Sequence, residues 1–186
     1  ETYGLFPDIQ DELQRKQALD AFTMMYGGTR GKDAVLDFLG QTGGEALRGA
    51  DILKTAMPKY SSNVEYAANP LAQSLKSVAQ VMFAGLGTRI FYTQHGSFDT
   101  HSGEPVAHAK LWDEVSSAIG DFYEDLNEHG RERDAAILVF SEFGRRIRDN
   151  GSGTDHGSGG VAFMIGGAVR GGMYGEYPSL KPEDQL

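Results

Sequence analysis

One unbroken apolar run at residues 135–140 constrains the fold of this chain more than any other feature of the sequence. The run has the length of a strand, and it lacks the alternation expected of a strand with one face in water. Such a run is typical of a strand buried on both faces, as in a parallel sheet covered by helices. We therefore expect a strand at 135–140 within an α/β fold.

The segment before this run predicts a long amphipathic helix. Its apolar residues recur at steps of three and four, at Leu111, Val115, Ala118, Ile119, Phe122 and Leu126. Gly130 then stands where a C-terminal cap belongs. Before the helix, residues 89–93 are rich in β-branched and aromatic side chains and predict another strand. Because strand, helix and strand in this order form a βαβ unit, we expect a mostly parallel sheet flanked by helices.

Two further elements frame this unit. Asn69-Pro70 predicts a helix start, because asparagine is a good N-cap and proline suits the first helical position. The apolar run 161–165 predicts a third strand, and the glycine-rich stretch 150–160 before it predicts a loop. No helix fits between 140 and 161, so we expect this third strand to run antiparallel to 135–140.

The chain divides into two regions within what we expect to be one domain. Residues 1–68 predict helices, interrupted at Gly27-Gly28 and at Gly43-Gly44, and form either packing material or a lid. Residues 69–186 predict the α/β core that carries the candidate site. The chain begins at Glu1 and ends in a polar segment, so we expect it to be a fragment of a longer protein.

Composition argues against several classes of function. The net charge of −9 disfavours nucleic acid as a partner, because phosphate binding needs clustered lysine and arginine. The absence of cysteine removes thiol catalysis, zinc–thiolate sites and disulfides. No stretch approaches the roughly 20 apolar residues of a membrane span. The oligomeric state does not follow from the sequence.

Polar side chains flank each predicted strand. Asp99 and His101 follow the first strand, Glu142 follows the second, and Asp155 and His156 precede the third. Ligands of open α/β sheets bind beyond the carboxyl ends of the strands, so we expect these side chains to converge. Carboxylate with imidazole suits zinc, manganese or iron, whereas oxygen ligands alone suit calcium or magnesium. The sequence thus predicts a divalent metal site, with zinc as the first choice.

Each of these clusters also has a plainer explanation. Asp99-Thr100-His101 is most often a turn or a helix cap rather than a ligand pair. Glu142 either caps the segment that follows or pairs with Arg145 or Arg146, and Arg145 itself is either an anion clamp or a solvated side chain. His95 either lines the pocket or belongs to a plain turn.

The polar clusters resemble the motifs of a known family. They are Gly96-Ser97-Phe98-Asp99-Thr100-His101, Ser141-Glu142-Phe143-Gly144-Arg145, Gly153-Thr154-Asp155-His156-Gly157 and Val169-Arg170-Gly171-Gly172. In order and spacing they look like the domain-of-unknown-function 1501 family, from about Leu71 to Leu180. These are bacterial proteins, often exported by the twin-arginine route and labelled sulfatase-like. The resemblance implies an exported or periplasmic protein.

That family is similar in turn to the alkaline phosphatase superfamily. The resemblance implies an alkaline-phosphatase-like α/β sandwich, of which this chain is the C-terminal portion only. It also implies that Asp99, His101 and His156 bind one metal and that Glu142 belongs to a second metal site. The resemblance places Phe143 where the superfamily carries a metal-binding histidine, and it implies that the nucleophile lies outside this chain.

The resemblance implies metal-dependent hydrolysis of a phosphate or sulfate ester, on a small molecule or a glycan. Arg145, Asp155 and His95 are the candidates for binding that substrate. The alternative is an exported, non-catalytic binding or structural module that keeps the fold and one metal. Loss of activity with retention of the fold in Asp99→Ala would favour catalysis, and unfolding on chelation would favour a structural role.

Overall fold

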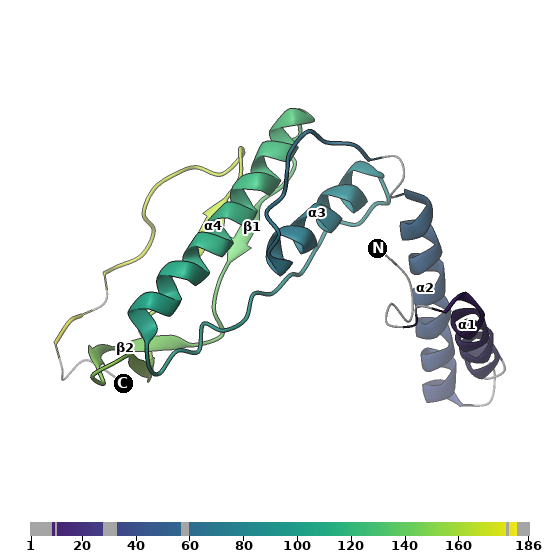
Figure 1. Ribbon diagram of the computed structural model, residues 1–186, viewed down its shortest axis with the longest axis horizontal. Helices are drawn as coiled ribbons and strands as arrows, with labels where there is room; N and C mark the ends of the chain where they lie inside the picture. The colour runs from purple at the N-terminus through teal and green to yellow at the C-terminus, as the bar shows by residue number, and fades with distance from the viewer. Residues whose placement is uncertain (1–8, 10, 28–32, 57–59, 178, 182–186) are drawn as a thin grey trace. The chain divides into compact units, whose positions relative to one another are not determined.

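The computed structural model describes residues 9, 11–27, 33–56, 60–177 and 179–181 (Figure 1). The elements of this described part are α1 (Glu12–Gly27), α2 (Ala34–Ala56), α3 (Pro70–Phe83), α4 (Glu104–Glu128), β1 (Ile137–Val139), β2 (Gly144–Asp149), β3 (Thr154–Gly157) and β4 (Phe163–Ile165). They belong to two compact units, one formed by 1–61 with 80–89 and the other by 62–79 with 90–186. No helix among the described residues is long and apolar enough to cross a membrane.

The first unit contains α1 and α2. Helix α1 ends at Gly27 as predicted, and the predicted stop at Gly28 lies outside the described residues. The predicted interruption at Gly43-Gly44 is wrong, because α2 runs through both glycines. Gly43 serves packing instead, since a Cβ there would lie only 2.6 Å from the ring of Tyr26 on α1.

The second unit is built around buried faces of α3 and α4. The buried apolar side chains of these helices are Leu71, Ala72, Leu75, Ala79, Leu111, Val115, Ala118, Phe122 and Leu126. Helix α3 begins as predicted, because Asn69 Oδ1 accepts a hydrogen bond from the Ala72 N–H at 2.9 Å. Helix α4 ends before Gly130, whose φ of 64° lies in the left-handed region, as the predicted cap requires.

Acidic side chains of α4 hold the extended segment that precedes α3. The Tyr66 hydroxyl donates to Asp125 Oδ2 at 2.6 Å, and the Asp125 side chain is fully buried. The Ala67 N–H donates to Asp121 Oδ2 at 2.8 Å. At the end of the helix, Glu128 accepts a hydrogen bond from the Ser62 hydroxyl at 2.6 Å. Three carboxylates of the helix therefore anchor this segment by accepting its hydrogen bonds.

Glu128 gives this anchor a defined pH dependence. The hydrogen bond from Ser62 lowers the pKa of Glu128 against the opposing effect of desolvation, and the Asn63 N–H lowers this pKa further. A pKa lowered by folding stabilises the protein above the unfolded-state pKa, and this contribution is lost as the pH falls through the folded-state pKa. We expect Glu128→Gln to reduce the free energy of unfolding at pH 7, and we expect this deficit to shrink as the pH falls through the folded-state pKa of Glu128. Urea unfolding at pH 7 and at progressively lower pH checks this, and a deficit that does not change with pH would contradict it.

The predicted mostly parallel sheet, and with it the alkaline-phosphatase-like sandwich, is wrong for the described residues. Strand β1 pairs antiparallel with β4, placing Ile137 opposite Ile165, and β2 pairs antiparallel with β3. These are separate two-stranded sheets, and the regular secondary structure of the described residues is mainly helical. The reason lies at 89–93, which is not a strand, so that β1 has no parallel partner across α4. The antiparallel orientation expected for the third predicted strand is confirmed in β4.

The hairpin formed by β2 and β3 replaces part of the predicted loop. Its turn closes through a hydrogen bond from the Asn150 N–H to the Gly153 carbonyl at 2.9 Å. Its strands approach so closely that a Cβ at Gly144 would lie 2.6 Å from the Gly157 carbonyl oxygen. The glycines that suggested a loop therefore permit a tight strand pair, which brings β3 to the candidate site.

Candidate metal centre

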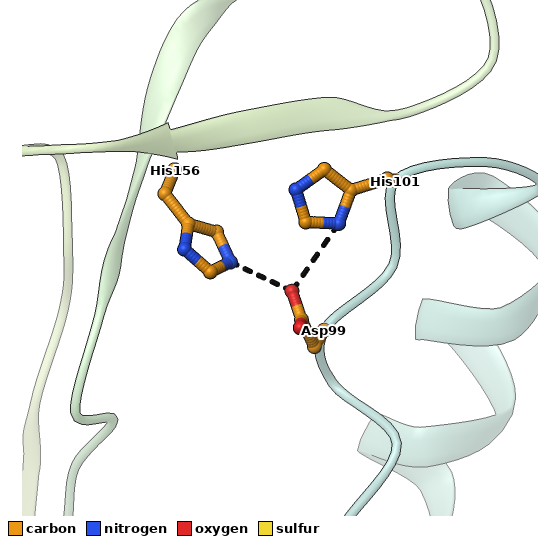
Figure 2. A group of neighbouring side chains, drawn as sticks. All are labelled: Asp99, His101 and His156. Atoms are coloured by element: carbon orange, nitrogen blue, oxygen red, sulfur yellow. Dashed lines mark hydrogen bonds and ion pairs between the residues drawn. The ribbon is translucent and has the colours of Figure 1, made fainter.

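The side chains of Asp99, His101 and His156 point toward one another (Figure 2). Asp99 Oδ1 lies 2.6 Å from His156 Nε2 and 3.3 Å from His101 Nδ1. One ligand atom from each residue lies within 4.8 Å of the others. We call these three residues the Asp99 cluster.

Local structure explains why these side chains meet. Asp99 and His101 lie two positions apart in the loop before α4. A hydrogen bond from the Thr100 N–H to the Phe98 carbonyl at 2.9 Å tightens this loop. His156 lies on β3, where its neighbour Asp155 points to the opposite face. The cluster therefore joins one loop to one hairpin.

The electrostatics of the cluster favour an ionised Asp99. The hydrogen bond with His156 is the main cause that lowers the pKa of Asp99, desolvation opposes it, and the charges of His156, His101 and Arg145 lower this pKa further. The three side chains remain accessible, with exposed fractions of 61% for Asp99, 48% for His101 and 47% for His156. A solute can thus reach the cluster directly.

The donor set fits a divalent metal. Two nitrogens and one carboxylate oxygen are ligands that zinc accepts, at bond lengths of about 2.0–2.2 Å. Two ligand atoms of a tetrahedral zinc ion then lie about 3.3–3.5 Å apart. The spacing between Asp99 and His101 already meets this value at 3.3 Å, whereas the 2.6 Å hydrogen bond to His156 has to open. Three protein ligands would leave a further position for water or substrate.

Glu142, the fourth predicted metal ligand, does not join the Asp99 cluster. It is exposed in the segment between β1 and β2 and lines a cavity of about 770 Å³. Phe143, next to it, stacks on the ring of His156 with the centroids 4.3 Å apart and an interplanar angle of 15°. The Phe143 ring thus packs against the candidate ligand His156. Phe143 also stands at the sequence position where the resemblance places a metal-binding histidine of the superfamily.

The predicted substrate-binding residues have other partners in the structure. His95 lines the same cavity as Glu142, and its Nε2 lies 3.1 Å from Glu114 Oε2 on α4, in an ion-pair contact rather than an aligned hydrogen bond. Asp155 Oδ1 accepts a hydrogen bond from the Asn150 side chain at 3.2 Å. The Arg145 guanidinium donates to main-chain carbonyls.

Two polar side chains that the sequence analysis did not single out connect the loop with the hairpin. Asn150 Nδ2 donates to the His101 carbonyl at 3.0 Å. Glu104 Oε2 accepts a hydrogen bond from the Thr154 hydroxyl at 2.8 Å. The signal that could have found Asn150 is its place before Gly151, a pair typical of tight turns. Nothing local marks Glu104, because its partner lies far away along the chain.

A second group of possible ligands lies at the end of α4. Ligand atoms of Asp125, Glu128 and His129 also fall within 4.8 Å of one another. Tyr66 and Ser62 already donate hydrogen bonds to the two carboxylates, so this group is explained by the anchoring of the segment before α3. It still has to be separated from the Asp99 cluster in any metal-binding experiment.

Comparison with known proteins identifies a family. The family described as "Protein of unknown function (DUF1501)" matches residues 13–185. Comparison with curated proteins gave no significant match, and comparison with solved structures gave none either. Because the match extends over most of the sequence, from before α2 to beyond β4, the chain belongs to the DUF1501 family.

Proposed function

We propose that this chain carries the metal site of a hydrolase that acts on phosphate or sulfate esters. The observation that carries the proposal is the convergence of Asp99, His101 and His156 on one point from two separate segments. Three such ligands with an open position are typical of catalytic zinc sites, whereas structural zinc sites usually have four protein ligands. Zinc is the first choice, followed by manganese, calcium and magnesium.

The residues of the cluster have distinct roles in this proposal. A divalent ion held there would supply Lewis acidity, both to activate a water molecule and to stabilise negative charge on an ester oxygen. Asp99 supplies the anionic ligand, because an aspartate side chain is ionised at neutral pH. His101 and His156 supply neutral nitrogen ligands. The exposure of all three side chains leaves the site open to an ester substrate.

The choice of ester rests on the sequence motifs. Their resemblance to sulfatase-like and phosphatase sequences favours phosphate or sulfate esters of a small molecule or a glycan, in an exported or periplasmic protein. The cavity of about 770 Å³ next to Asp99 is lined in part by Phe98 and Trp112, which suits the organic part of such a substrate. No side chain of this chain is assigned as the nucleophile, so the attacking group in this proposal is the water molecule that the ion would activate.

A non-catalytic, metal-binding module is the second candidate. Glu142 stays outside the cluster and Phe143 occupies the face of His156, so the described residues supply ligands for one ion there. Two-metal sites hold both the attacking and the leaving oxygen of a displacement, and one ion does less. This observation favours binding without turnover.

Hydrolysis of p-nitrophenyl phosphate and p-nitrophenyl sulfate by the zinc-loaded chain distinguishes the two candidates. We expect turnover of one ester, and a loss of more than about 100-fold in Asp99→Asn, because replacing groups that merely support a ligand already costs 10–100-fold. Asp113→Asn, an exposed aspartate on α4, is the matched control and should keep full activity. A chain that binds zinc but hydrolyses neither ester would overturn the hydrolase and support the binding module.

A further inference from the structure

The side chain of Arg145 lies between the two segments that carry the Asp99 cluster. Its Nη1 donates to the Thr154 carbonyl and its Nη2 to the Phe98 carbonyl, both at 2.6 Å. Phe98 immediately precedes Asp99, and Thr154 lies two residues before His156. One guanidinium therefore ties the loop to the hairpin on either side of the cluster.

Arg145 also supports the orientation of His156. The ring of Phe143 stacks on the His156 imidazole, and the Arg145 guanidinium carbon lies 5.0 Å from the centroid of the same Phe143 ring. In the backbone, Arg145 is the partner of His156 in the pairing of β2 with β3. The imidazole is thus held by stacking and by strand register together.

We propose that Arg145 is a positioning residue that presets the Asp99 cluster for metal binding and does not bind the substrate anion. This inference rests on the proposed metal site. Only 17% of the side chain is exposed, and its hydrogen bonds go to the Thr154 and Phe98 carbonyls and, at 3.5 Å, to the Thr100 hydroxyl. The forked geometry of a guanidinium reaches two carbonyls at once, which the single ammonium group of lysine does not reproduce.

The positive charge of Arg145 allows a positioning role to be distinguished from a purely electrostatic effect on the bound cation. Its Nη2 lies 4.0 Å from Asp99 Oδ1, so the positive charge stands close to the position of a bound cation. By Coulomb repulsion alone, removing this charge would strengthen metal binding. If Arg145 positions the ligands, removing it weakens metal binding instead, and the sign of the change decides between the two roles.

Zinc affinity of the native chain, Arg145→Lys and Arg145→Gln, measured by competition with a chromophoric chelator, tests the proposal. We expect both variants to bind zinc about 10–100-fold more weakly, as for other residues that orient metal ligands. Arg148→Lys, an exposed arginine on the same strand, is the control and should bind as the native chain does. Cobalt(II) absorption spectra should change in both Arg145 variants, because the ligand geometry changes.

Other outcomes would overturn the proposal. Unchanged zinc affinity in both Arg145 variants, together with a raised KM for an ester, would mean that Arg145 binds the substrate anion instead. Tighter zinc binding in Arg145→Gln would mean that Arg145 affects metal binding only through its positive charge.

A measurement without metal separates this inference from the proposed function. In NMR spectra of the metal-free chain, the imidazole resonances of His101 and His156 should shift in Arg145→Lys and should not shift in Arg148→Lys. If the native chain binds no zinc while these resonances shift, the proposed metal site fails, and Arg145 is left as a residue that orients the two imidazoles without a metal-binding role. If the resonances do not shift, the positioning role fails.

Discussion

Replacing His156 by glutamine should weaken zinc binding by more than about 100-fold, because the variant loses one of the three ligands. The loss of a group that only orients a ligand already weakens metal binding by about 10–100-fold. The His156 Nε2 atom lies 2.6 Å from Asp99 Oδ1 and is the cluster's only contribution from the hairpin. Glutamine keeps a polar side chain of similar length but offers no imidazole nitrogen. Competition with a chromophoric chelator, with elemental analysis of the dialysed protein, measures the loss.

His95→Gln is the matched control for this experiment. Its imidazole lines the neighbouring cavity, but it faces Glu114 at 3.1 Å and lies outside the Asp99 cluster. We expect this variant to keep the native zinc affinity. Zinc that survives in His156→Gln but is lost in His129→Gln would instead move the site to the group at the end of α4.

Replacing Leu126 by alanine should reduce the free energy of unfolding by about 2–5 kcal/mol. Leu126 is only 1% exposed on the buried face of α4, so alanine leaves a cavity among packed side chains. Urea unfolding followed by circular dichroism measures the change. Val106→Ala on the same helix is the control, because Val106 is 82% exposed and surface substitutions usually stay within about 0.5 kcal/mol. Equal losses in both variants would mean that this face of α4 is not the core.

The helices of this chain could be predicted because their signals are local. The steps of three and four between Leu111 and Leu126 mark the buried face of α4, and Asn69 caps α3 through a side chain only three residues from its partner. Gly43 led to the wrong prediction of a helix end. The glycine lies inside α2, where it permits close contact with Tyr26 of α1. A glycine that breaks a helix and one that packs a helix look alike in sequence.

The sheets could not be predicted, because strand pairing depends on distant residues. The apolar run at 135–140 identified a strand but not its neighbours, and β1 pairs only with β4 among the described residues. Strand β2 contains three arginines within Gly144–Asp149 and has no apolar alternation, so its sequence does not indicate a strand. Its partner β3 lies within a glycine-rich stretch that favours a loop.

The sequence allowed the residues of the candidate site to be predicted, but not the contacts that their side chains make. Asp99, His101 and His156 come together as expected, although on a loop and a hairpin rather than at the edge of a parallel sheet. The direction of a side chain follows from pairing and packing, which the sequence does not specify. For this reason the contacts of Arg145 with Phe98 and Thr154 appeared only in the structure.

Zinc K-edge X-ray absorption of the zinc-loaded chain tests the central claim most directly. We expect one zinc environment with two imidazole nitrogens and at least one oxygen at about 2.0–2.2 Å, and loss of an imidazole contribution in His101→Gln. A spectrum that contains only oxygen scatterers, or one that is identical in the native chain and in His101→Gln, would contradict a metal site at Asp99, His101 and His156.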